Sequence, residues 1–219
     1  MSIFDRFLNL LFPMRCVACG ASSSPLCHDC LKNVPEATEI AHPFISALYS
    51  YRYPAIKKAL WALKYRNNLT LAKIFGAALY EHLLEHTYEF TAFSSAEQRA
   101  KPVIVPIPIS KKRLRERGFN QSEKIIESLQ TLDESRSFAF ENNILCKTKE
   151  TPPQASIKNR AARLQNICGC FAVRNPEKIK NKVVIVVDDI TTTGATLNEA
   201  IITLENAGAA RAIGVAIAH

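Results

Sequence analysis

The sequence lacks several patterns that would place it in familiar functional classes. Its 219 residues contain neither the G-x-x-x-x-G-K-[ST] pattern of an NTPase phosphate loop nor the G-x-G-x-x-G pattern of a dinucleotide-binding fold. No apolar run approaches the ~20 residues of a membrane span, and the opening segment has neither a basic start nor an A-x-A cleavage site behind it. These absences argue against a P-loop NTPase, a dinucleotide enzyme and a secreted protein. They predict a cytoplasmic location without a transmembrane segment.

An odd number of cysteines without a secretion signal argues against a disulfide framework. Four of the seven form two C-x2-C pairs near the amino end, at Cys16, Cys19, Cys27 and Cys30. This is the spacing of a four-thiolate zinc cage in a knuckle that depends on its metal to fold. A redox C-x-x-C is the alternative, but such a motif usually follows a strand and occurs once. His28 is expected to face solvent, and the other cysteines are expected to be small buried residues: Cys146, Cys168 and Cys170.

The composition is that of a folded protein with an excess of positive charge. Hydrophobic residues make up 47% of the chain, which is enough for a core in one main domain with a small appendage. The 28 lysines and arginines exceed the 20 acids, so the net charge is +8. Such a charge favours an anionic partner, whether a phosphate ester, a nucleic acid or an acidic protein.

The opening segment, 1–14, carries recurring apolar residues. It predicts an amphipathic helix that covers the body of the protein, with attachment to a membrane surface as the alternative. The amino-terminal unit, made of this helix and the cysteine knuckle, is therefore expected over 1–40, and the main domain over 41–219.

One stretch organises the main domain. Val183 to Val187 is a run of five β-branched apolar residues, which predicts a strand buried on both faces of a parallel sheet. Asp188 and Asp189 follow it directly. Carboxylates at that place are expected to face the crevice at the carboxyl end of the strand, where open α/β sheets bind ligands.

A hydroxyl-rich loop follows the acids and leads into a helix. Its residues are Thr191, Thr192, Thr193, Gly194, Ala195 and Thr196. Apolar residues then recur at helical spacing from Leu197 to Ala207, with Gly208 as the helix stop. Hydroxyls, backbone N–H groups and the helix dipole suit a phosphate there, and Gly194 permits close approach or a positive φ. The two carboxylates can accept hydrogen bonds from a ribose diol, so a sugar 5-phosphate would satisfy both halves; an ordinary helix N-cap is the alternative.

A second buried strand is predicted over 102–109, and a strongly basic segment follows it. Five of seven residues there are cationic: Lys111, Lys112, Arg113, Arg115 and Arg117. We interpret the segment as a loop one strand away from the acid pair, where its charge would neutralise a pyrophosphate. An exposed basic turn is the alternative.

The remaining elements complete an α/β pattern. Strands are expected over 47–53, 144–146, 166–173 and 212–218, helices over 54–65, 69–86 and around 125–129, and connections over 87–101, 133–143 and 151–155. This order predicts a largely parallel twisted sheet flanked by helices. On the first helix, Trp61 is expected in the core. The basic residues of that helix are expected on a solvated face that could rim an anion groove: Lys57, Lys58, Lys64 and Arg66.

The stretch Asp-Asp-Ile-Thr-Thr-Thr-Gly-Ala-Thr resembles the PRPP-binding motif of type I phosphoribosyltransferases. Further blocks resemble the ComF family, in the same order along most of the chain. They are the two cysteine pairs, the segment Tyr53–Tyr65, Val105–Pro108, Arg117–Gln121, and the Thr151-x-x-Gln154 loop with Arg160, Arg163 and Asn166. The Arg-Gly-Phe-Asn-Gln block together with the amino-terminal cysteines is what points to this family.

The resemblance implies a zinc-finger domain followed by a type I phosphoribosyltransferase-like domain, in a cytoplasmic protein of natural transformation that handles incoming single-stranded DNA. It implies PRPP or a related 5-phosphoribosyl ligand with Mg²⁺, and a structural Zn²⁺. Other DNA-uptake proteins, such as a helicase or a recombination mediator, are expected partners, with a place near the inner membrane. DNA contacts are expected from Lys57, Lys58, Lys64, Arg66, Arg115 and Arg117.

Two functions of different class stay open at this point. The first is a DNA-uptake factor that binds a phosphoribosyl ligand and single-stranded DNA. The second is an active phosphoribosyltransferase of nucleotide salvage. Transfer chemistry needs an acid pair near the sugar, Mg²⁺ and cations on the leaving pyrophosphate, and Asp188, Asp189, Lys111, Lys112 and Arg113 could supply them. It also needs a nucleobase pocket, which these residues do not identify.

Overall fold

The computed structural model describes residues 14–22, 24–38, 40, 42–91, 100–149 and 167–219. Residues 1–13 of the expected opening helix lie outside this part of the chain. The loop expected over 151–155 lies outside it as well, together with Arg160, Arg163 and Asn166.

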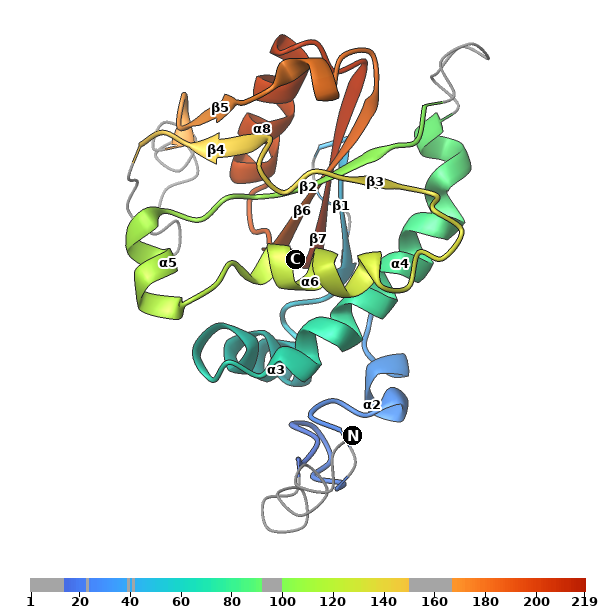
Figure 1. Cartoon of the computed structure of the whole chain (residues 1–219). Helices are drawn as coiled ribbons and strands as arrows, with labels where there is room; N and C mark the ends of the chain where they lie inside the picture. The colour runs from blue at the N-terminus through green and yellow to red at the C-terminus, as the bar shows by residue number, and fades with distance from the viewer. Residues whose placement is uncertain (1–13, 23, 39, 41, 92–99, 150–166) are drawn as a thin grey trace.

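Within these described residues, five parallel strands form the central sheet, in the order β1, β7, β6, β2, β3 (Figure 1). Their bounds are β1 Ile45–Tyr49, β7 Arg211–Ala218, β6 Val183–Ile190, β2 Val103–Pro106 and β3 Ala139–Phe140. The middle strand is β6, and its residues Val183 to Val187 are all buried. The uniform apolar run therefore forms the doubly buried strand that it predicts, and the α/β fold with a parallel sheet is confirmed.

The pleat of β6 sends alternate side chains into two separate cores. Ile185 and Val187 pack with α3, α4 and α6, whereas Val184 and Val186 pack with α8 and with a small antiparallel sheet of β4 and β5. The bounds of these elements are α3 Pro54–Tyr65, α4 Leu69–Thr91, α6 Gln121–Gln130, α8 Ala195–Asn206, β4 Leu145–Lys147 and β5 Phe171–Val173. A 3-10 turn, η3 Pro176–Lys178, precedes β6. Helices thus cover both faces of the sheet, as predicted.

Helices α4 and α6 approach each other most closely at Gly76. A Cβ atom at this position would lie 2.8 Å from the carbonyl oxygen of Ile125 and 2.8 Å from Cβ of Ser128. Such distances are far shorter than ordinary contacts, so the packing of α4 on α6 requires glycine here.

The basic segment Lys111–Arg117 is helix α5 and not the expected loop. Ser110 begins the helix, because its Oγ accepts a hydrogen bond from the backbone N–H of Arg113 at 3.3 Å. Gly118 ends it in the left-handed conformation, with φ 79°. Ser110 and Gly118 are both recognisable in the sequence as helix boundaries. The loop was predicted because the segment is so strongly charged.

Three shorter stretches also differ from expectation. Helix α4 continues to Thr91, because residues 87–91 contain no glycine or proline to stop it. Two residues of the expected connection over 133–143 form β3, which exists through its parallel pairing with β2. The strand expected from residue 166 begins at Phe171, since a turn with Gly169 at φ 63° precedes it.

The cysteine segment, which includes α2 His28–Lys32, is joined to the main body through β1 and a shared core. The backbone N–H of Ala37 donates to the carbonyl of Leu48 at 3.2 Å, and that of Ser50 donates to Pro35 at 2.9 Å. Leu26 is buried in the same core as α3 and α4. Within the described residues, no helix has the length and apolarity needed to cross a membrane.

Candidate functional site

A cavity of about 470 Å³ opens at the carboxyl ends of β2 and β6. Its floor is the end of β6 with the loop that follows, and its walls come from α3, α5, the start of α6, and the β4–β5 sheet. The lining includes Trp61, Lys64, Tyr65, Ile107, Arg113, Arg117, Asn120, Gln121, Ser122, Lys147, Phe171, Asp188, Asp189 and Thr191 to Thr196. The topology thus brings together segments that lie far apart in the sequence.

The hydroxyl-rich loop lines this cavity and ends at the amino terminus of α8. Gly194 has φ 75°, which is one of the two roles that the sequence allows for it. Its Cβ position would lie 3.1 Å from Cδ1 of Ile45, so a larger residue would also crowd β1. Helix α8 has 12 residues and begins at Ala195, so its dipole directs positive potential into the cavity. All residues of the predicted phosphate loop, from Thr191 to Thr196, line the site.

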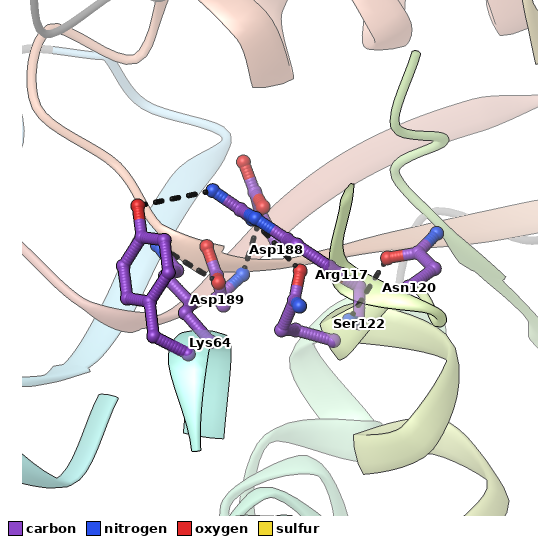
Figure 2. Close-up of polar contacts among 8 residues, drawn as sticks. Lys64, Arg117, Asn120, Ser122, Asp188 and Asp189 are labelled. Carbon is purple, nitrogen blue, oxygen red and sulfur yellow. Dashed lines mark hydrogen bonds and ion pairs between the residues drawn. The ribbon is translucent and has the colours of Figure 1, made fainter. Parts of the chain in front are cut away.

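The two carboxylates differ in their surroundings. Asp189 is buried, and its Oδ2 lies 2.9 Å from Nζ of Lys64 on α3, with both side chains less than a fifth exposed. Asp188 accepts a hydrogen bond through Oδ1 from the backbone N–H of Asp189 at 2.8 Å. Figure 2 shows Lys64 pointing from α3 toward the acid pair. Lys64 therefore belongs to the site and not to a solvated face, which corrects the prediction for this residue.

Burial and the neighbouring charge of Asp189 raise the pKa of Asp188 from 3.8 to about 7, while Lys64 and Arg113 oppose the rise. One carboxylate of the pair is thus neutralised by a lysine and the other is poised to titrate near neutral pH. Perturbed carboxyl groups of this kind cluster at functional sites.

Helix α5 contributes two of its five cations to the cavity. Arg113 and Arg117 line it, whereas the other three are exposed on α5: Lys111, Lys112 and Arg115. Arg117 is held in place, because it donates to Oε1 of Gln121 at 3.0 Å and to the hydroxyl of Tyr65 at 3.4 Å (Figure 2). The cations point in different directions around the helix axis, so some face the cavity and the others face solvent.

The block that follows α5 builds the wall beside Arg117. Asn120 is buried, donates through Nδ2 to the carbonyl of Ile107 at 2.9 Å and accepts from the N–H of Ser122 at 3.1 Å, so it caps α6 and ties it to the end of β2. Gln121 is buried as well, and its Nε2 has no hydrogen-bond partner among the described residues. An unpaired buried donor costs about 1–3 kcal/mol, so a ligand or water at this wall would relieve it. The sequence identifies this block only through the family resemblance. It indicates neither the capping by Asn120 nor the buried amide of Gln121.

Trp61 is half exposed at the mouth of the cavity and not in the core. The buried residues of α3 are Ala55, Ile56, Ala59, Leu60, Ala62 and Leu63, and the tryptophan lies on the opposite stripe. The sequence does indicate this position. Lys57, Trp61 and Tyr65 are spaced four residues apart, so they lie on one face of the helix. Lys57 and Lys58 are exposed on α3, as is Arg66 just after it.

The four amino-terminal cysteines form a second centre. Their Sγ atoms all lie within 4.8 Å of one another, and those of Cys19 and Cys27 are 3.7 Å apart. Tetrahedral Zn–S bonds of about 2.3 Å place sulfur atoms about 3.8 Å apart, so the spacing fits such an ion. The backbone N–H of Cys27 also donates to Sγ of Cys16 at 3.4 Å. The cluster can therefore hold a metal ion, and His28 faces solvent beside it as expected.

The other three cysteines lie apart from this centre. Cys170 is buried as expected, Cys146 is partly buried, and Cys168 is exposed. The prediction for Cys168 was wrong because this residue lies in the turn that precedes β5 and not in a strand.

Comparisons with known proteins agree with the geometry of the cavity. The family model of the phosphoribosyl transferase domain matches residues 93–219. Competence protein ComFC of Streptococcus pneumoniae is 31% identical over 187 residues, which cover 85% of this chain and 71% of the relative. Competence protein F of Haemophilus influenzae is 24% identical, covering 83% and 75%. DNA utilization protein YhgH of Escherichia coli K12 is 26% identical, covering 89% and 80%.

The similarity covers most of this chain and most of each of these relatives. A phosphoribosyltransferase domain fills more than half of the sequence, and the similarity to a competence protein extends well beyond it. The chain therefore belongs to the ComF family.

Proposed function

We propose that the cavity binds PRPP or a related 5-phosphoribosyl ligand with Mg²⁺, and that the protein serves DNA uptake in natural transformation. One observation carries the ligand: a paired acid and a hydroxyl-rich loop at a helix amino terminus line the same cavity. The names of the relatives support the biological role, because two of the three reported above are competence proteins and the third is a DNA utilization protein.

In this proposal each part of the ligand has its own partners. The 5-phosphate lies in the loop from Thr191 to Thr196 at the amino end of α8, where N–H groups and hydroxyls are donors. The ribose hydroxyls donate to Asp188 and Asp189. Arg113 and Arg117 neutralise the pyrophosphate, and Mg²⁺, which prefers carboxylate and phosphate oxygens, completes the charge balance.

The ion pair between Lys64 and Asp189 gives binding a further requirement. A ribose hydroxyl that donates to Asp189 must share this carboxylate with Lys64 or displace the ammonium group from its position 2.9 Å away. We expect Lys64→Met to change the affinity for the ligand. Replacement of a lysine that only faces solvent would leave this affinity unchanged.

Calorimetric titration with PRPP and Mg²⁺ at pH 8 tests the proposal. The wild-type protein is expected to bind, and Asp188→Asn with Asp189→Asn is expected to weaken binding at least about 100-fold, since two charge-assisted hydrogen-bond acceptors are lost. Lys180→Ala is the matched control, because this exposed residue lies just ahead of the opposite end of β6. Equal affinity in the acid variant and the control would contradict the proposal, as would no binding by the wild-type protein.

A second candidate function is phosphoribosyl transfer, which one observation favours. The pKa of Asp188 is raised to about 7, near the pH at which a general acid or base works best. Asp188 and Asp189 would act at the sugar and Arg113 at the leaving group, while the exposed Lys111 and Lys112 would have to close over it. Incubation with PRPP, Mg²⁺ and a panel of nucleobases decides the question: pyrophosphate release that depends on one base supports transfer, and release no faster than without protein excludes it for that panel.

The DNA-handling role rests on the cations outside the cavity. Exposed basic residues lie on α3, after it and on α5: Lys57, Lys58, Arg66, Lys111, Lys112 and Arg115. Together with Arg117 they would neutralise the phosphates of single-stranded DNA, so the affinity should fall steeply with salt. A flat, negligible affinity at low salt would exclude this role. A cytoplasmic location close to the inner membrane, with a helicase or a recombination mediator as partner, belongs to the same proposal.

For the cysteine cluster we propose a structural Zn²⁺. The tetrahedral spacing of the sulfur atoms and the N–H donor to Cys16 support it. Such an ion would fix the knuckle, whose own apolar content is small.

A further inference from the structure

At the mouth of the cavity, two aromatic rings and two guanidinium groups form a continuous row. The rings of Trp61 and Tyr65 lie 5.6 Å apart, inclined at 42°. Arg66 lies over the ring of Trp61 at 5.0 Å, and Arg117 lies over the ring of Tyr65 at 5.3 Å. We name these four residues the stacking row.

The stacking row is unusual for a surface. Trp61 is 50% exposed and Tyr65 is 59% exposed, whereas tryptophan side chains are highly buried on average and tyrosine side chains intermediate. The row is also firmly built, because Tyr65 accepts a hydrogen bond from Arg117, which Gln121 fixes in turn. Aromatic rings and guanidinium planes are surfaces on which nucleobases stack, with little preference among the bases.

Its position joins the two halves of the proposed function. Arg117 lines the phosphoribosyl cavity, and at the other end of the row Arg66 directly follows α3, the helix that carries the exposed Lys57 and Lys58. A single strand along this face would meet aromatic planes for its bases and cations on both sides for its phosphates. We propose that the stacking row binds the bases of single-stranded DNA beside the cavity. This inference rests on the proposed DNA-handling function.

Trp61 makes the proposal directly measurable, because it is the one tryptophan of the chain. A base stacked on its ring should quench its fluorescence. The protein is titrated with a labelled oligo(dT) and with an abasic strand of the same length, and binding is followed separately by anisotropy of the label. At equal occupancy, we expect strong quenching by oligo(dT) and little by the abasic strand. Equal quenching by both strands, or none by either, would overturn the proposal.

Two variants then test affinity. Trp61→Ala with Tyr65→Ala should weaken oligo(dT) about 10–100-fold, since stacking contributes about 1–3 kcal/mol per base. The same variant should leave the abasic strand within a factor of three. Trp61→Phe should keep most of the affinity and supports the same conclusion if the double variant does not fold. Lys57→Ala with Lys58→Ala is the control for charge, because it should weaken both strands equally.

Other occupants of the row give different results, and each would overturn the proposal. Quenching by free dTMP at the affinity of oligo(dT) would assign the row to nucleotides and not to a strand. A dimer that Trp61→Ala dissociates in sedimentation would assign it to a second copy of the chain.

Failure of this inference can be told apart from failure of the proposed phosphoribosyl site. If the wild-type protein binds PRPP and the double aromatic variant loses its preference for oligo(dT) over the abasic strand, both assignments stand. If base-dependent quenching persists while PRPP does not bind the wild-type protein, the ligand assignment fails and the stacking row stands.

Discussion

Lys64 illustrates how a single side chain can set the state of a site. Its ammonium group lies 2.9 Å from Asp189 and is largely shielded from water, so the charge of this carboxylate is compensated before any ligand arrives. Burial and the charge of Asp189 raise the pKa of Asp188 next to it, and Lys64 only partly offsets that rise.

The titration of Asp188 should make stability depend on pH. Because its pKa is 3.8 ordinarily and about 7 in the folded protein, the folded state binds an extra proton between these values. Its contribution to stability therefore falls as pH rises from about 4 to about 7. Asp188→Asn removes this penalty, so its melting temperature should match the wild type near pH 4 and exceed it at pH 8, by on the order of 5 °C.

Thermal unfolding at several pH values checks this prediction. Binding of PRPP with Mg²⁺ should show the opposite trend, since the cation favours the ionised acid. A difference in melting temperature between Asp188→Asn and wild type that stays constant from pH 4 to pH 8 would mean that the carboxyl group titrates normally.

The packing of helices α3 and α4 determines the core, and that of α3 also determines the shape of the cavity mouth. Helix α3 turns its apolar stripe to the core and leaves Trp61 and Tyr65 at the mouth of the cavity, so one element supplies both core and site. Helix α4 lies so close to α6 that only a hydrogen atom fits at Gly76.

Gly76→Ala tests this close crossing through the sign of its effect. In an exposed helix the change would stabilise by about 1 kcal/mol, because alanine has the higher helix propensity. Here the new methyl group meets the backbone of α6, so we expect a net loss of about 1–3 kcal/mol. Chemical denaturation measures it, and a gain in stability would show that the two helices lie further apart than described.

The elements could be predicted from sequence where the pattern is local. Val183 to Val187 indicates a buried strand by itself, and the apolar spacing after Gly194 indicates α8. Strand β3 could not be predicted, because two residues become a strand only through pairing with β2. The residues of the phosphate loop could be named in advance, but Lys64 could not, since nothing in the sequence indicates that α3 lies against the end of β6.

At the scale of the whole molecule, the cysteine cluster and the sheet are parts of one packed body. Cys16, Leu26 and Val34 are buried in the same core as the apolar stripe of α3. Loss of the metal should therefore affect more than the knuckle.

Cys16→Ser should abolish stoichiometric zinc and lower the melting temperature of the entire protein, and a strong chelator should do the same to the wild type. Metal analysis and thermal unfolding measure both effects. Cys168→Ser is the matched control, because this exposed cysteine lies outside the cluster and should keep one zinc per chain. Retained zinc in Cys16→Ser would contradict the four-thiolate site.

The strand order also sets a schedule for folding. Among the described strands of the sheet, β7 is the one that pairs with β1, and Ile45 meets Gly214 across that pairing. Residues 211–218 must therefore be synthesised before β1 can pair with β7. Helices α3 and α4 can form earlier, during translation, because their hydrogen bonds are local. Before β7 pairs with β1 and β6, the edges of these two strands that β7 will cover are unpaired. The nascent protein is then most prone to aggregation.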